Sequence, residues 1–139
     1  MSWFSTAFFH FELPGDAWEE QTLNIFRPTD DERSYLMVGR AKIPETGPIP
    51  VAKLIEDLPM GEYDERKIIR HEWRQVGPLE GEDVGLFARS GTTGEYYRFV
   101  SVPYYDLEVT FQFVGPMAQR GHVDRRAEST LQSVRFRKR

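Results

Sequence analysis

Hydrophobic residues along this chain recur mainly with the two-residue period of a β-strand. Successive side chains of a strand point to opposite faces, so apolar residues at every second position mark a face that a core can bury. Residues 106–114 show this most clearly, because Leu107, Val109, Phe111 and Phe113 alternate with polar side chains. We assign these four residues to the core. Such runs, bounded by turn-forming residues, predict seven strands, near residues 7–13, 20–27, 34–43, 67–76, 83–90, 95–102 and 106–114.

Two segments replace this alternation with the spacing of an α-helix. In PIPVAKLIEDLPMG (48–61), apolar residues recur at i, i+3, i+4 and i+7, and prolines stand at both ends of the repeat. In GHVDRRAESTLQSVRF (121–136), apolar residues again share one helical side and the other positions are polar, which is typical of a helix on a surface. The apolar stripes consist of Val51, Leu54, Ile55 and Leu58 in the first helix and Val123, Ala127, Leu131 and Val134 in the second.

The order of these elements predicts the fold class. Three strands, a helix, four strands and a second helix indicate an α+β protein, mainly an antiparallel β-sheet packed with two helices, both covering one face. The 139 residues are the length of one ordinary domain, which we expect to span residues 1–139.

Three of the predicted strands are apolar on both faces, which one buried sheet face does not explain. In DAWEEQTLNIFRP (16–28), alternation places Trp18, Asn24 and Phe26 on one face and Leu23 and Ile25 on the other. Segments 34–43 and 95–102 show the same two-sided pattern. A contiguous apolar patch on a protein surface usually marks a binding site or an oligomer contact. The alternative is that a loop or the N-terminal segment covers this second face.

Composition and charge exclude several classes of function. A formal net charge of −4 argues against a nucleic-acid binder that neutralises phosphates, and the basic end at 135–139 has the composition of a solvated tail. The chain has no cysteine, which removes disulfides, thiolate nucleophiles, sulfur-ligated zinc and a cysteine-linked lipid anchor. No apolar run reaches the ~18 residues that span a bilayer, and the N-terminus lacks the positive region of a signal peptide. We expect a cytoplasmic protein that does not insert into membranes.

Candidate catalytic chemistry is sparse, and we predict no enzyme, metal or cofactor site. The chain has no glycine-rich phosphate loop, no zinc-protease motif and no nucleophile elbow. His71 and Glu72 form the closest acid–base pair in sequence, but adjacent strand residues point to opposite faces. An enzyme would require a pocket in which His71 or His10 meets a carboxylate.

One stretch near the N-terminus resembles a known family. FELPGDAWEEQTLNIFRP (11–28), followed by SYLMVGRA (34–41), is similar to the start of DcrB-like domains. The similarity is greatest to the Eag proteins, the effector-associated chaperones of bacterial type VI secretion. The shared pattern is an apolar strand ending in proline, an acid-Ala-Trp step, a glutamine, and then alternating apolar residues around an asparagine. In this chain it consists of Leu13-Pro14, Asp16-Ala17-Trp18, Gln21 and Leu23-Asn24-Ile25-Phe26.

The resemblance implies a Mog1/PsbP-like (DcrB-like) α+β fold, a homodimer and a client. Eag chaperones bind the N-terminal region of a secreted effector, which contains transmembrane helices, and shield it in the cytoplasm before export. The apolar pair that lines the client groove corresponds to Leu23 and Ile25, with Val38 as a neighbour on the next strand. We therefore expect Trp18 and Phe26 to pack inward.

The resemblance also implies polar side chains that hydrogen-bond the client helices. The matching positions are closest to Leu54 and Phe99, which are apolar in this chain. Leu54 also lies on the apolar stripe of its predicted helix, so a core role is the alternative. Gln112, on the polar face of its strand, is a second candidate for the hydrogen-bonding role. A stand-alone DcrB-like protein-binding module, unrelated to secretion, is the alternative function.

Overall fold

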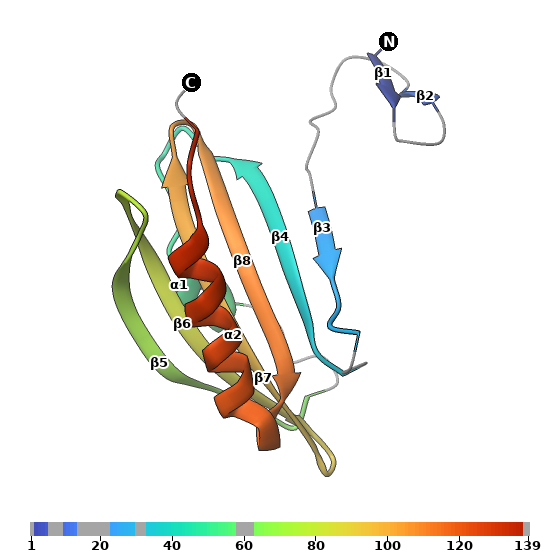
Figure 1. Cartoon of the computed structure of the whole chain (residues 1–139), viewed down its shortest axis with the longest axis vertical. Helices are drawn as coiled ribbons and strands as arrows, with labels where there is room; N and C mark the ends of the chain where they lie inside the picture. The colour runs from blue at the N-terminus through green and yellow to red at the C-terminus, as the bar shows by residue number, and fades with distance from the viewer. Residues whose placement is uncertain (1, 6–9, 14–22, 30–32, 58–62, 138–139) are drawn as a thin grey trace.

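The chain folds into an antiparallel sheet with one helix on each face (Figure 1). The computed structural model describes residues 2–5, 10–13, 23–29, 33–57 and 63–137. The elements are β1 (Ser2–Ser5), β2 (His10–Leu13), β3 (Leu23–Phe26), β4 (Tyr35–Lys42), α1 (Val51–Asp57), β5 (Glu65–Val76), β6 (Leu79–Ser90), β7 (Thr93–Tyr104), β8 (Leu107–Pro116), the 3-10 turn η1 (Met117–Gln119) and α2 (Arg120–Ser133). The predicted α+β class with an antiparallel sheet and two helices is confirmed.

Six strands form the main sheet in the order β3-β4-β8-β7-β6-β5, and β1 and β2 form a separate two-stranded sheet. Strands β5 to β8 form a meander because each pair is joined by only two residues. Gly77 and Gly91 open two of these turns with positive φ angles of 59° and 61°, and Tyr105 opens the third at 56°. Positive φ matches the twist of a two-residue hairpin, and glycine adopts it without strain.

The helices pack on opposite faces of the sheet, so the expectation that both cover one face is wrong. The α2 helix buries Val123, Ala127 and Leu131 against one face. On the other face, α1 buries Ile55 against β6. In Figure 1, α2 crosses in front of the sheet and α1 lies behind it. The physical reason is that β7 is apolar on both sides, with Tyr96 and Val100 on one and Phe99 on the other, and each side requires its own cover.

The larger core lies under α2 and contains three of the four residues that alternation assigned to it, whereas Leu107 is only partly buried and belongs to neither core. Phe111 and Phe113 of β8 are buried there, and Val109 packs against them. The smaller core under α1 joins Ile55 to Val84 and Leu86 of β6, with Tyr97 and Phe99 of β7 packed alongside.

Several predicted boundaries differ from the structure. The turn expected at 76–83 contains only Gly77 and Pro78, because Leu79–Asp83 already belongs to β6. The first predicted strand, 7–13, is described only as β2, and the additional strand β1 pairs with it. Of the strand expected at 20–27, the described part is β3.

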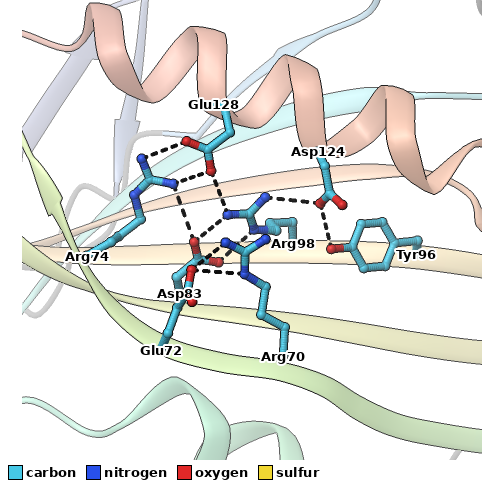
Figure 2. Close-up of polar contacts among 8 residues, drawn as sticks. All are labelled: Arg70, Glu72, Arg74, Asp83, Tyr96, Arg98, Asp124 and Glu128. Atoms are coloured by element: carbon cyan, nitrogen blue, oxygen red, sulfur yellow. Dashed lines mark hydrogen bonds and ion pairs between the residues drawn. The ribbon is translucent and has the colours of Figure 1, made fainter.

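A buried ionic network attaches α2 to the sheet (Figure 2). Arg98 of β7 is fully buried and makes a bidentate pair with the fully buried Asp83 of β6, at 2.7 and 2.6 Å. The same guanidinium reaches Asp124 and Glu128 of α2, each at 3.0 Å. Arg74 of β5 also donates to Glu128, at 2.6 Å. The α2 carboxylates therefore point toward the sheet.

The network changes the pKa values of its members in the direction that favours the charged pairs. Hydrogen bonds from Arg74, reinforced by those from Arg98, lower the pKa of Glu128 to about 2 against the opposing effect of burial. Burial and the hydrogen bond to Asp124 raise the pKa of Tyr96 to about 12, so its hydroxyl remains a donor. Burial lowers the pKa of Arg98, but its hydrogen bonds to Asp83 more than compensate and the net pKa is raised.

Candidate protein-binding face

The α1 side of the sheet continues beyond α1 onto strands β8, β4 and β3. Register shows which side chains share this side, since paired residues point the same way. One row across the sheet joins Ile25, Met37, Gln112 and Phe99. The next row joins Leu23, Gly39, Thr110 and Ser101. We call the part of these rows on β3, β4 and β8 the open face; it consists of Leu23, Ile25, Met37, Gly39, Thr110 and Gln112.

Leu23 and Ile25 lie at the edge of the open face and expose large apolar side chains. Their exposed fractions are 56% and 55%, and both stand on the edge strand β3. They share one face, as the alternation predicts. Met37 and Gln112 lie beside Ile25 across the ladder and are partly exposed. The open face therefore begins as an apolar strip and becomes polar toward the centre of the sheet.

Small residues form the second row of the open face. Gly39 has no side chain, Thr110 lies next to it on β8, and Ser101 lies next to Thr110 on β7. The hydroxyl groups of Ser101 and Thr110 are 3.4 Å apart, and Ser101 also donates to the carboxylate of Glu108. Ser101 is buried, so the partly exposed members of this row on the open face are Gly39 and Thr110.

Two sequence predictions about this region are wrong. Val38 pairs with Asn24, not with the Leu23 and Ile25 side, and it packs against the α2 core. Met37 holds the position expected for Val38. Phe26 points to the α2 side as predicted, but 56% of it is exposed instead of packed inward. Its predicted partner Trp18 lies outside the described residues.

The remaining predicted site residues lie on the α1 side of the structure. Phe99 packs at the margin of the α1 core and is stacked on Tyr97, with the ring centroids 6.0 Å apart. Leu54 is on α1 and 48% exposed, whereas Ile55 is the helix residue that enters the core. Phe99, Gln112, Leu23 and Ile25 therefore share one side of the sheet. Their role in binding a client stays a prediction.

Glu82 of β6 holds the N-terminal end of α1 in place beside this side of the sheet. Its nearly buried carboxylate accepts hydrogen bonds from the backbone N–H groups of Val51, at 2.5 Å, and Ala52, at 3.5 Å. The same carboxylate lies 2.7 Å from Nε2 of His71 on β5. Glu82 was missed by sequence reasoning, because residues 76–83 have the composition of a turn.

An enzyme would require a histidine in contact with a carboxylate, and His71 makes such a contact with Glu82. Glu72, the sequence neighbour of His71, points to the other face and pairs with Arg70. The Glu82 carboxylate, however, is already engaged by two backbone groups of α1. A helix N-terminus favours a negatively charged partner, so this carboxylate has a structural function at α1.

Tyrosine hydroxyl groups on the α1 side of the sheet form a hydrogen-bonded group. The Tyr97 hydroxyl donates to the Glu95 carboxylate, and it lies 2.9 Å from the Tyr63 hydroxyl. Burial, followed by these hydrogen bonds, raises the pKa of Tyr97. The pKa of Tyr35, one strand away from β8, is raised by burial and by Glu95. The raised pKa values keep the hydroxyl groups of Tyr97 and Tyr35 neutral beside the open face.

Metal and membrane features were searched among the described residues. Within those residues, no group of three or more His, Asp or Glu side chains is placed to hold a metal ion. Across the same ranges, neither helix has the length and apolar character that a bilayer span requires.

Comparison with known proteins supports the fold. The chain matches no protein-family profile and no curated protein. Among solved structures, it is similar to the crystal structure of PA94, a protein of unknown function from Pseudomonas aeruginosa that has been suggested to be a regulator. The two share 15% sequence identity, with a TM-score of 0.67 over 99% of this chain and 98% of the other. Similarity at this identity establishes a shared fold over nearly the whole length.

Proposed function

We propose that this protein is a cytoplasmic chaperone and adaptor that binds the N-terminal transmembrane-helix region of a type VI secretion effector before export. The observation that carries the proposal is the exposed pair Leu23 and Ile25, which continues into the open face. The resemblance of residues 11–28 and 34–41 to Eag chaperones supports the nature of the client. We also propose, from the same resemblance, that the protein works as a homodimer.

The dimensions of the open face suit one helix. Neighbouring strands are about 4.8 Å apart, so β3, β4 and β8 together span roughly 10 Å, close to the diameter of an α-helix with side chains. The helix α1 stands on β6 beside this space. A client helix lying over β4 and β8 would then have α1 as one neighbour and the β3 side chains as the other.

The chemistry of the open face suits a helix that is apolar on all sides. Such a helix aggregates in water, and each Å² of apolar surface that it buries contributes about 25 cal/mol. Gly39 and the small side chain of Thr110 permit close approach of a helix backbone, as small residues do between membrane helices. Gln112 and Thr110 supply hydrogen-bond partners for the polar atoms of the client. Partial exposure of the face is consistent with a client that must later be released.

The proposal is tested by co-expression with the N-terminal helical region of the effector encoded beside this gene. We expect a soluble complex with the unchanged protein and loss of the complex with the double variant Leu23→Asp plus Ile25→Asp. Both side chains are more than half exposed, so the double variant should still fold. Phe26→Asp is the matched control: Phe26 stands on the same strand with the same exposed fraction but points to the other face. This control should keep the complex.

Two outcomes would contradict the proposal. If the folded double variant still keeps the effector region soluble, the open face is not the binding site. If the protein binds no effector helix, but binds another protein in a manner that depends on Leu23 and Ile25, it is a stand-alone DcrB-like binding module. Light scattering of the protein in solution tests the homodimer separately.

A further inference from the structure

Glu108 of β8 is a carboxylate at the border of the open face with an unused acceptor. It points to the same side of the sheet as Thr110 and Gln112, because the three alternate along one strand. Its Oε1 atom accepts the hydrogen bond from the Ser101 hydroxyl, whereas Oε2 is buried and has no hydrogen-bond partner among the described residues. Native proteins rarely leave a buried polar atom unpaired, because this is costly. The side chain as a whole is partly exposed, so a ligand can supply the missing donor.

The neighbours of Glu108 provide space but no compensating charge. Across the ladder, Glu108 pairs with Ala41 on β4 and with Pro103 on β7, and both are exposed. Neither side chain carries a donor or a positive charge. A ligand that covered Glu108 with apolar surface alone would bury an uncompensated carboxylate, which is strongly unfavourable. The part of a ligand that lies on Glu108 must therefore carry N–H or O–H donors or positive charge.

Glu82 shows how a carboxylate on this side of the sheet binds a helix. It shares a row with Ser101 and Thr110, one row from Glu108, or about 7 Å along the strands. Glu82 accepts hydrogen bonds from two backbone N–H groups at the start of α1, at 2.5 and 3.5 Å. The first N–H groups of a helix have no partner within the helix and carry partial positive charge. A carboxylate supplies both an acceptor and the opposite charge.

The direction of α1 on the sheet indicates the direction of a neighbouring helix. The helix α1 starts at Glu82 and runs along β6 toward Leu86, because Ile55 near its end packs there. Strands β6 and β8 run in the same direction, since both are antiparallel to β7. Glu108 is the second residue of β8. It therefore lies at the end of the open face where a helix parallel to α1 would begin.

We propose that Glu108 caps the N-terminal end of the client helix and sets its direction parallel to α1. This inference rests on the proposed chaperone function. The first backbone N–H groups of the client helix donate to Oε2 of Glu108, and the positive end of the helix dipole compensates the carboxylate. The rest of the helix runs over the open face past Thr110 and Gln112. A helix in the opposite direction would bring its negative end to Glu108, which is unfavourable.

The capping role is tested by binding of a defined helix to the full chain. The probe is a helix of 20 leucine and alanine residues, preceded by Gly-Gly and joined at its C-terminal end to a soluble carrier protein. Glu108→Gln should weaken binding about 10-fold, because hydrogen bonds to a charged acceptor are lost. Glu72→Gln is the matched control, since it removes the same charge from an exposed position on the other side of the sheet, and it should leave binding unchanged.

A second probe separates capping from a structural effect of the substitution. It carries Asp-Asp in place of Gly-Gly, so that its helix has its own acidic cap and repels Glu108. The unchanged protein should bind this probe about 10-fold more weakly than the first. Glu108→Gln should bind the two probes equally. Circular dichroism of Glu108→Gln should match that of the unchanged protein, since the substitution keeps the shape of the side chain.

Cross-linking tests the direction of the bound helix. The chain has no cysteine, so Ala41→Cys and Met37→Cys each introduce a unique thiol on β4. Ala41 lies in the row of Glu108 and Met37 in the row of Gln112, about 13 Å further along the strand, which equals about nine helical residues. With a short bifunctional maleimide, Ala41→Cys should link to a cysteine at the third helical residue of the probe. Met37→Cys should link to a cysteine at the twelfth.

Two kinds of result would overturn the inference. The reverse linking pattern, equal linking at both ends, or unchanged probe binding by Glu108→Gln would show that Glu108 does not cap the helix. In each of these cases, loss of probe binding with Leu23→Asp plus Ile25→Asp would leave the proposed function supported. If the unchanged protein binds neither probe, the proposed function is contradicted, and the inference fails with it.

Discussion

Replacement of Arg98 by methionine should destabilise the protein strongly. Arg98 and Asp83 are both completely buried, and the two groups are joined by two short hydrogen bonds. Removal of one partner from a buried ion pair typically costs about 3–5 kcal/mol, because the remaining charge stays buried without compensation. Arg74 lies 3.5 Å from Asp83 and retains part of the attraction. We therefore expect a loss near the lower limit, about 3 kcal/mol.

The assay is urea unfolding at neutral pH, followed by circular dichroism and tryptophan fluorescence. Coincident transitions by both probes would justify a two-state free energy of unfolding. Arg125→Met is the control, since this exposed arginine of α2 lies outside the network, and its loss should change stability by less than about 0.5 kcal/mol. The double variant Arg98→Met plus Asp83→Leu should recover most of the loss, because well-packed apolar residues often replace a buried pair without cost.

Two results would refute this reasoning about Arg98. A loss below about 1 kcal/mol in Arg98→Met would show that Asp83 is readily solvated or re-paired, and that the network does not hold the fold. A double variant as unstable as the single one would place the main contribution elsewhere, in the bonds from Arg98 to Asp124 and Glu128.

Two further predictions concern single carboxylates. Because hydrogen bonds from Arg74 lower the pKa of Glu128 from 4.5 to about 2, its stabilising effect is complete above pH 4.5 and is lost as the pH falls toward 2. Solvent screens this partly exposed group, so urea unfolding should give a difference of about 1–2 kcal/mol between the protein and Glu128→Gln at pH 6. At pH 2, where about half of the carboxylate is protonated, most of this difference should be lost, and a difference that stays constant with pH would contradict the linkage. Glu82→Gln should cost about 1–3 kcal/mol, because it weakens the acceptor for two N–H groups of α1. Faster hydrogen exchange at Val51–Ile55 than in α2 would confirm the local effect, and unchanged exchange would contradict it.

The sequence was most informative where one strand has one buried face. The alternation in β8 identified Val109, Phe111 and Phe113 as core residues, since polar side chains mark the other face, although Leu107 at the start of the strand is only partly buried. The two helices were also found from the spacing of their apolar residues, although only α2 buries its stripe, whereas in α1 Ile55 is buried and Leu54 is 48% exposed. In β6 this reasoning failed: Glu82 and Asp83 look like turn residues, yet both are buried. Their partners are an arginine 15 residues later and helix N–H groups about 30 residues earlier, which no local pattern contains.

In the candidate site, too, the sequence pattern of one strand does not reveal contacts with other strands. Alternation alone placed Leu23 and Ile25 on one face, since that relation lies within a single strand. The neighbour across the ladder depends on register, and a shift by one residue exchanges the two faces of a strand. The sequence predicts Val38 as the neighbour of Ile25, but Met37 holds that position. Both residues are apolar, so nothing within β4 shows which of them faces the same side as Ile25. Likewise, Gly39 and Thr110 became part of the site only when register brought β4 and β8 together.

The two-sided apolar character of β3 and β4 now has a structural explanation. Each face of the sheet has its own helix, but α1 packs on β6 and α2 on the central strands, so neither helix covers the β3 end. On one face this leaves Leu23 and Ile25 exposed, and on the other it leaves a cavity beside Phe26. A single strand of four residues thus contributes to two surfaces that point in opposite directions. Because Ile25 and Phe26 point to opposite faces, Ile25→Asp should weaken the proposed client binding at the open face, whereas Phe26→Asp should leave it unchanged.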